Sequence, residues 1–285
     1  MQKGPDGIQV SRITAVEVRE HLGVDPAPFA RTPNCGVNWD LNTLKPLSPS
    51  KFFLGHRAKL MKFFDLKSEP MTRSFLDAYL LETMSQMKPG IEKLSLVGEI
   101  GIQYTSSTGA FINGFGDWVL AYGEVGTGRH TYNISLIGEA KRSGGLELDA
   151  EQNILQLLTY MIIVHKERLK AGKQSAAVCG FLSNFDRFRF FKITHEGSIL
   201  KSHSFDERRE PGLILACMHK LFTSAQASSP STMAPSQAAT MTQGIIVERG
   251  DIAGPFGEEL DEGWDEEIDE LLAEIEEEGP TSSVA

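Results

Sequence analysis

The sequence contains little cysteine, and its three cysteines form no Cys-x-x-Cys pair. Cys35, Cys179 and Cys217 are an odd number at wide spacing, so neither a disulfide framework nor a zinc site is indicated. The seven histidines also lack metal-ligand spacing. These absences exclude a disulfide-stapled secreted domain, and we expect the cysteines to pack in the core of a protein from a reducing environment.

Long apolar runs are missing as well. The first seven residues lack the apolar segment of a secretory signal, and no stretch is long enough to cross a bilayer. The longest apolar helix-like segment, residues 155–164, is interrupted by polar residues and fits a protein core. We therefore expect an intracellular protein, nuclear or cytoplasmic, with no membrane partner.

Positive charge is absent from the end of the chain. Residues 251–285 contain fourteen Asp and Glu and no Lys or Arg, within a formal net charge of -10. Of the 38 acidic residues, 24 remain elsewhere against 28 basic ones, so the rest of the chain has a net charge of +4. A mildly basic body favours a polyanionic partner only weakly.

The length of 285 residues allows one domain with extensions, or two small domains. Prolines interrupt residues 1–65, which we predict to be an irregular extension with a short helix at 15–22. Residues 66–222 form the predicted main domain. The uncharged stretch 223–243 makes 223–250 a predicted disordered linker, and 251–285 is an acidic tail.

Periodicity predicts the elements of the main domain. The predicted helices lie at 71–87, 149–171 and 211–222, and the predicted strands at 94–104, 110–122, 132–141, 176–182 and 188–194. A further helix is predicted at 51–64, where phenylalanines alternate with basic residues. We expect its aromatic side chains to pack on the core, and a grip on a nucleic-acid strand is the alternative.

Two of the predicted strands carry charged residues in an apolar pattern. Residues 117–122 alternate as in a strand that Asp117 opens. Residues 134–141 are apolar on both faces until Glu139, as in a buried central strand. Because side chains alternate along a strand, Glu139 and Lys141 reach the same pocket, and Asp117 joins them if the strands pair.

This grouping of charges suits phosphodiester hydrolysis. Two neighbouring carboxylates resist ionisation unless a cation lies between them. Mg²⁺ suits that position because it binds carboxylate oxygens, water and substrate phosphates, and it lowers the pKa of bound water. Lys141 can hold the attacking water or offset charge in the transition state. We therefore predict a metal site formed by Asp117 and Glu139.

The helix at 149–171 adds polar groups to the same region. Its apolar stripe consists of Ile154, Leu158, Met161, Ile162 and His165. Gln152, Gln156 and Tyr160 lie four residues apart on another face, where neutral donors can hold the lysine, a water or a phosphate. For Tyr160, packing against the strands explains the residue as well as a catalytic contact does.

These elements together resemble the PD-(D/E)xK nuclease superfamily. Gly-Phe-Gly-Asp at 114–117 matches a Gly-x-x-Asp element, Glu-Ala-Lys at 139–141 a Glu-x-Lys element, and Gln156 with Tyr160 a Gln-x-x-x-Tyr element. Gly116 stands where the family name has proline. The segment 180–193 is also similar to a strand in the nuclease-like domains of fungal and oomycete Crinkler-type proteins, and the resemblance covers roughly residues 71–222.

The resemblance implies an α/β fold of the restriction-endonuclease-like type, with a central mixed sheet of four to five strands flanked by helices. It implies a divalent metal cofactor, Mg²⁺ or Mn²⁺, and DNA or RNA as the substrate, of which we favour DNA. The residues it implies to be catalytic are Asp117, Glu139, Lys141, Gln156 and Tyr160. Asp117 and Glu139 would bind the metal, with Glu99 as a third ligand and Glu82 as its substitute.

The acidic tail allows several partners. Residues 264–278 can form a helix with one apolar face, although like charges oppose such a helix in isolation. We expect it to fold only against a partner, either another protein bound through residues 258–278 or the basic groove of this chain, covered as a mimic of DNA. A solvated tail is the third option.

Other functions are compatible with the sequence. Glu139 and Lys141 can be an ion pair on an edge strand, with Gln156 an ordinary helix residue. The chain can be a catalytically inactive effector or scaffold of the same fold, bound to a protein through its tail. It can also be a chromatin-associated or transcriptional factor driven by that tail.

Overall fold

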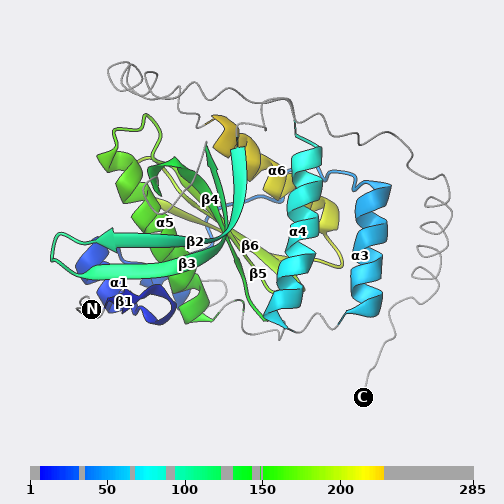
Figure 1. Ribbon diagram of the computed structural model, residues 1–285. Helices are drawn as coiled ribbons and strands as arrows, with labels where there is room; N and C mark the ends of the chain where they lie inside the picture. Colours follow the sequence, from blue (N-terminus) through cyan, green and yellow to red (C-terminus); the bar gives the residue numbers. More distant parts are fainter. Residues whose placement is uncertain are drawn as a thin grey trace, which may run out of the picture.

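The computed structural model describes residues 7–31, 36–64, 68–87, 94–122, 131–142, 148 and 150–227. These residues form one seven-stranded mixed sheet with helices on both faces (Figure 1). In chain order the elements are β1 (Ile8–Gln9), η1 (Val10–Arg12), α1 (Ala15–Leu22), α2 (Ala27–Ala30), α3 (Lys51–Phe63), α4 (Glu69–Ser85), β2 (Leu94–Thr105), β3 (Phe111–Tyr122), η3 (Thr131–Asn133), β4 (Ile134–Ala140), α5 (Glu151–Lys170), β5 (Val178–Ser183), β6 (Arg187–Ile193), β7 (Ile199–Asp206) and α6 (Pro211–Ala227). The predicted disordered linker began at residue 223, but residues 223–227 belong to α6. The rest of the linker and the acidic tail lie outside the described residues.

The strand order is β1-β3-β4-β5-β6-β7, with β2 paired to β3 along its other edge. β4 and β5 are parallel, and α5 is the crossover that this pairing requires. β4 has neighbours on both edges and is buried along its whole length, which explains its continuous apolar sequence. Among the described residues, no helix is both long and apolar enough to span a bilayer.

The sheet has seven strands rather than the four to five that were expected, because β1 and β7 join it. β7 is hard to predict because its buried positions include Lys201 and Ser202. The preceding chain covers them: the Asn38 and Trp39 backbone N–H groups donate to the Lys201 carbonyl at 3.0 Å. Lys201 Nζ donates to the Phe29 carbonyl at 2.7 Å. These polar residues are therefore buried because of contacts with segments distant in the sequence, which the pattern within the strand does not predict.

The segment expected to be an irregular extension contributes to the core. β1 pairs in parallel with β3, and α1 begins at a capping box between Thr14 and Glu17. α3 forms where a helix was expected, with Ser50 as its N-cap, and it packs on α4. Of the phenylalanines at 51–64 that were expected to pack on the core, Phe53 is buried, whereas Phe52, Phe63 and Phe64 are exposed. The described residues among the first 64 therefore pack against the main domain and belong to the same fold.

Two apolar layers enclose the sheet. α5 and the elements before α3 cover one face, and the apolar stripe predicted for α5 is buried there. α4 and α6, with α3 outside α4, cover the other face (Figure 1). Burying two faces of one sheet leaves its strand ends as the place for polar chemistry.

β2 and β3 form a long two-stranded arm that changes its orientation near its middle (Figure 1). Along β3, Ile112 packs toward the α5 layer at one end and Val119 at the other, so the inward positions change from even to odd numbers. Glu99 lies at this change with φ of 53°, a left-handed conformation that costs a non-glycine residue of order 1 kcal/mol. The change brings Asp117, the residue after Gly116, to the side of the pocket described below.

Candidate functional site

The charged residues predicted to act together line one open pocket at the carboxyl end of β4. The pocket has a volume of about 420 Å³. Its lining residues are Glu69, Arg73, Glu99, Phe115, Asp117, Glu139, Lys141 and Gln156. Four of the five residues predicted to be catalytic are therefore neighbours, contributed by β3, β4 with its following residue, and α5.

Asp117 lies where β3 and β4 separate. The last described pair of their ladder is Trp118 with Gly138. Beyond it, Oδ2 of Asp117 accepts a hydrogen bond from the backbone N–H of Ala140 at 2.7 Å. The side chain thus replaces a backbone partner that the ladder no longer supplies, and this bond fixes the Asp117 carboxylate beside β4.

Glu139, Lys141 and Gln156 form a closed triangle of hydrogen bonds. Oε2 of Glu139 accepts from Lys141 Nζ at 3.1 Å and from Gln156 Nε2 at 3.0 Å. Lys141 Nζ also donates to Gln156 Oε1 at 3.1 Å. Gln156, on the first turns of α5, therefore orients the carboxylate and the ammonium group at once.

Glu139 has an unfavourable environment for a carboxylate. Its side chain is 1% exposed, and its Oε1 atom has no hydrogen-bond partner. Burial raises the pKa of Glu139 to about 8, Lys141 opposes this rise, and the neighbouring Asp117 adds to it. Burial also raises the pKa of Asp117, against the Ala140 hydrogen bond and the charge of Arg73. Both carboxyls would gain from an additional cation.

Arg73 enters the pocket from α4, and the sequence does not predict it there. Its guanidinium donates to Asp117 Oδ1 at 2.5 Å, to Glu99 Oε1 at 2.8 Å and to Glu69 Oε1 at 3.4 Å. The only sequence signal is the Glu69–Arg73 spacing of four, which is common on helix surfaces. Docking of α4 on the sheet is what places a cation among three carboxylates.

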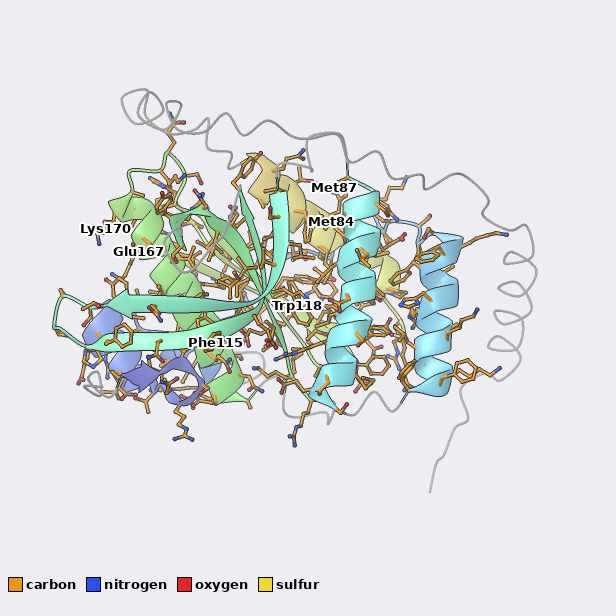
Figure 2. All side chains as sticks on the ribbon, viewed as in Figure 1. Met84, Met87, Phe115, Trp118, Glu167 and Lys170 are labelled. Atoms are coloured by element: carbon orange, nitrogen blue, oxygen red, sulfur yellow. The ribbon has the colours of Figure 1, made fainter. Side chains whose placement is uncertain are left out.

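Trp118 anchors α4 next to the pocket. Its indole N–H donates to Asp77 Oδ1 at 2.8 Å, and Asp77 lies one turn after Arg73 on α4. Figure 2 shows Trp118 where β3 passes α4, with Phe115 further along the same strand. Arg73 therefore faces Asp117 because the next turn of its helix is tied to the neighbouring residue of β3.

The two acidic residues expected upstream have different positions. Glu99 lies on the pocket rim with its side chain 74% exposed, and it pairs with Arg73. Glu82 is away from the pocket: it accepts from the backbone N–H and hydroxyl of Ser50, both at 2.7 Å. Glu82 therefore belongs to the start of α3, and of the two only Glu99 lies near Asp117.

Tyr160 packs behind the pocket and is not one of its lining residues. It is buried, and burial raises the pKa of its phenol, so the hydroxyl is neutral. Its ring lies against Gly114, where an added Cβ would be 2.9 Å from the ring atom Cε1. The glycine of the Gly-x-x-Asp element and the tyrosine of the Gln-x-x-x-Tyr element thus interlock, and the Tyr160 hydroxyl also hydrogen-bonds with the Gln156 side chain.

The donor set suits one divalent cation only in part. Within the described ranges, no group of three or more His, Cys, Asp or Glu could hold a metal ion. Asp117 and Glu139 supply two carboxylates, and Oε1 of Glu139 has no hydrogen-bond partner. Mg²⁺ commonly takes one or two carboxylates and completes its shell with water and phosphate. The residues present fit that mode of binding.

Comparison of the chain with protein-family models and with curated proteins finds no match. A functional proposal for this protein therefore depends on the chemistry of the pocket and on the sequence elements that form it.

Proposed function

We propose that the protein is a Mg²⁺- or Mn²⁺-dependent nuclease that hydrolyses phosphodiester bonds in DNA, with RNA as the less favoured substrate. The observation that carries this proposal is the buried Glu139 carboxylate with one unpartnered oxygen, in one pocket with Asp117, Lys141 and Gln156. Burying a carboxylate without a full set of partners lowers the stability of the folded protein, and such groups occur mostly at functional sites.

The arrangement of elements supports a restriction-endonuclease-like core. Asp117 and Glu139 come from adjacent antiparallel strands, and Lys141 follows two residues after Glu139. The crossover helix α5 then returns the chain to the parallel strand β5 and contributes Gln156 on the way. This is the order of elements that the three sequence motifs lead us to expect.

Each side chain has a role that its contacts suggest. Asp117 and Glu139 would hold the cation, which when bound supplies a water of lowered pKa and stabilises charge on the phosphoryl oxygens. Lys141 Nζ, oriented by Gln156, would donate to the attacking water or to a phosphoryl oxygen. The water oxygen bonds to phosphorus and loses a proton, the bond from phosphorus to the leaving oxygen breaks, and the leaving oxygen takes up a proton.

Arg73 balances the charge of Asp117 and Glu99 in the protein without metal. A guanidinium binds phosphate as readily as carboxylate, because its donors match both. We therefore expect Arg73 to pass from Asp117 to a phosphate of the substrate when a cation takes its place.

The direct test is cleavage of labelled single- and double-stranded DNA and RNA with Mg²⁺ or Mn²⁺. Activity should disappear with EDTA and in Lys141→Ala, because the ammonium group beside Glu139 is lost. Lys170→Ala is the matched control, since that lysine is exposed on α5 and should be dispensable. Cleavage by Lys141→Ala at the original rate would show that the assigned role is wrong.

The alternative is an inactive protein of the same fold that binds a protein partner through residues 258–278, which lie outside the described residues. The position of Arg73 favours it, because the guanidinium already provides a cation for Asp117. Calorimetric titration with Mn²⁺ separates the two proposals. Heat of binding that is lost in Asp117→Ala supports the nuclease, and absence of heat in the original protein supports the binding module.

A further inference from the structure

Phe115 is an exposed aromatic residue at the edge of the proposed catalytic pocket. Its side chain is 69% exposed, although phenylalanine is mostly buried in proteins. It lines the pocket with Asp117, which follows two residues later on β3 (Figure 2). An exposed aromatic ring beside catalytic groups is placed to contact whatever enters the pocket.

The backbone around Phe115 keeps its ring available. Phe115 pairs with Gly101 on β2, and a Cβ at Gly101 would be 3.6 Å from the ring atom Cε1. One face of the Phe115 ring therefore packs on the backbone at Gly101, where no side chain intervenes. Further along the arm, Gln103 is exposed and Asn113 is partly buried, so the neighbouring surface is polar.

Building on the proposed nuclease function, we infer that Phe115 is a positioning residue that stacks on a nucleobase next to the cleaved phosphate. Phe115 and Asp117 are two residues apart, about 7 Å along a strand, and both line the same pocket, so the ring and the carboxylate can contact one nucleotide and its phosphate. Base faces inside a duplex are covered by their neighbours, whereas an unpaired base offers its face to an aromatic ring. The preferred substrate is therefore a strand with unpaired bases at the site.

The charges around Phe115 favour nucleic acid over a peptide as the occupant. Arg73 and Lys141 share the pocket and can both contact phosphate oxygens. A protein interface would instead need a larger apolar patch, and Phe115 is flanked by glycine and polar residues. Aromatic stacking with cationic contacts to the backbone is the usual way to bind single strands without sequence preference.

The test compares Phe115→Leu, which keeps an apolar side chain, with Phe115→Trp, which keeps an aromatic ring. Both changes are made in the Lys141→Ala protein, to prevent cleavage. Binding of a single-stranded oligonucleotide that contains 2-aminopurine is then measured, and quenching of its fluorescence reports stacking of the base. We expect Phe115→Leu to weaken binding roughly 5- to 100-fold and to abolish quenching, and Phe115→Trp to retain both. Leu169→Ala is the control for loss of an exposed apolar side chain, since Leu169 on α5 is 47% exposed and outside the pocket lining.

Cleavage assays of the same variants in the active protein complete the test. Phe115→Leu should slow single-strand cleavage far more than duplex cleavage, with an unchanged melting temperature. Equal effects on both substrates, equal losses in Leu169→Ala, or unchanged single-strand cleavage in Phe115→Leu would overturn the stacking role and leave the nuclease intact. Quenching by Phe115 without cleavage by the original protein would uphold the stacking contact and refute the nuclease.

Discussion

Glu139 illustrates how far a single residue can be understood from the sequence. The alternation of side chains along a strand predicts that it shares a face with Lys141, and the structure joins the two at 3.1 Å. The sequence does not predict that Oε1 lacks a partner, because that depends on which atoms surround the carboxylate. Arg73 is invisible for the same reason, since only the docking of α4 brings it to Asp117.

The raised pKa of Glu139 predicts how stability depends on pH in the metal-free protein. The folded protein holds this proton up to about pH 8, whereas an ordinary Glu loses it near 4.5. The folded state therefore binds more protons in this range, and the free energy of unfolding falls as pH rises from 5 to 9. Asp117 contributes with the same sign, because burial raises its pKa too.

Urea denaturation with EDTA at pH 5, 7 and 9 measures this dependence. Glu139→Gln should lose stability less steeply, by about 1–3 kcal/mol over the range, because a neutral amide has no proton to release. Adding Mg²⁺ to the original protein should restore stability more at pH 9 than at pH 5. An identical slope in Glu139→Gln would show that the carboxylate is not destabilised by its burial.

At the scale of elements, β3 and α5 are held together by the contact of Gly114 with Tyr160. Both residues belong to the motifs that indicate a nuclease, yet the structure connects them by packing. Tyr160 is buried, and the space for a side chain at Gly114 is taken by its ring. This contact positions Gln156, one turn earlier on α5, against Glu139.

Gly114→Ala is expected to destabilise the protein by about 1–3 kcal/mol, because its Cβ would overlap the Tyr160 ring. In the double variant with Tyr160→Leu, the combined loss should be smaller than the sum of the two single losses. Gly98→Ala is the matched control, since its Cβ would meet only a backbone oxygen at 3.6 Å. Thermal melting of the original protein, the two single variants and the double variant measures the coupling, and strict additivity would refute the contact.

Long periodic elements were predictable, and those defined by distant contacts were not. The predicted helix at 149–171 corresponds to α5 (Glu151–Lys170), and the predicted strand at 110–122 to β3 (Phe111–Tyr122). β7 escaped prediction because Lys201 is buried only by the covering segment around Asn38. The left-handed Glu99 is equally hidden, since the twist of the β2–β3 arm imposes it.

At the scale of the whole molecule, charge is divided between a mildly basic body and an acidic end. The fourteen carboxylates of residues 251–285 oppose the approach of a polyanion unless a partner neutralises them. Within the described residues, the last element, α6, buries its apolar face in the core. The sequence predicted this division of charge, whereas the role of the tail stays a prediction.

Deletion of residues 251–285 should leave the melting temperature unchanged and leave or raise the rate of cleavage at low salt. The expected rise has an electrostatic cause, so it should shrink at 0.5 M salt, roughly three times the physiological ionic strength. Cleavage rates of both proteins at two salt concentrations provide the measurement. Loss of all function with a folded body would point instead to a transcriptional or chromatin-associated role of the tail.

Arg73 belongs to α4, whereas Asp117 and Glu139 belong to the sheet. The net charge of the pocket therefore depends on how α4 packs against the sheet, and not only on the residues of the strands. Sliding α4 by a single turn, about 5.4 Å, would withdraw the guanidinium from Asp117 and Glu99, whereas Lys141 would still pair with Glu139. If Asp117 and Glu139 bind a cation as we propose, a shift of α4 would change the affinity for that cation without altering either carboxylate.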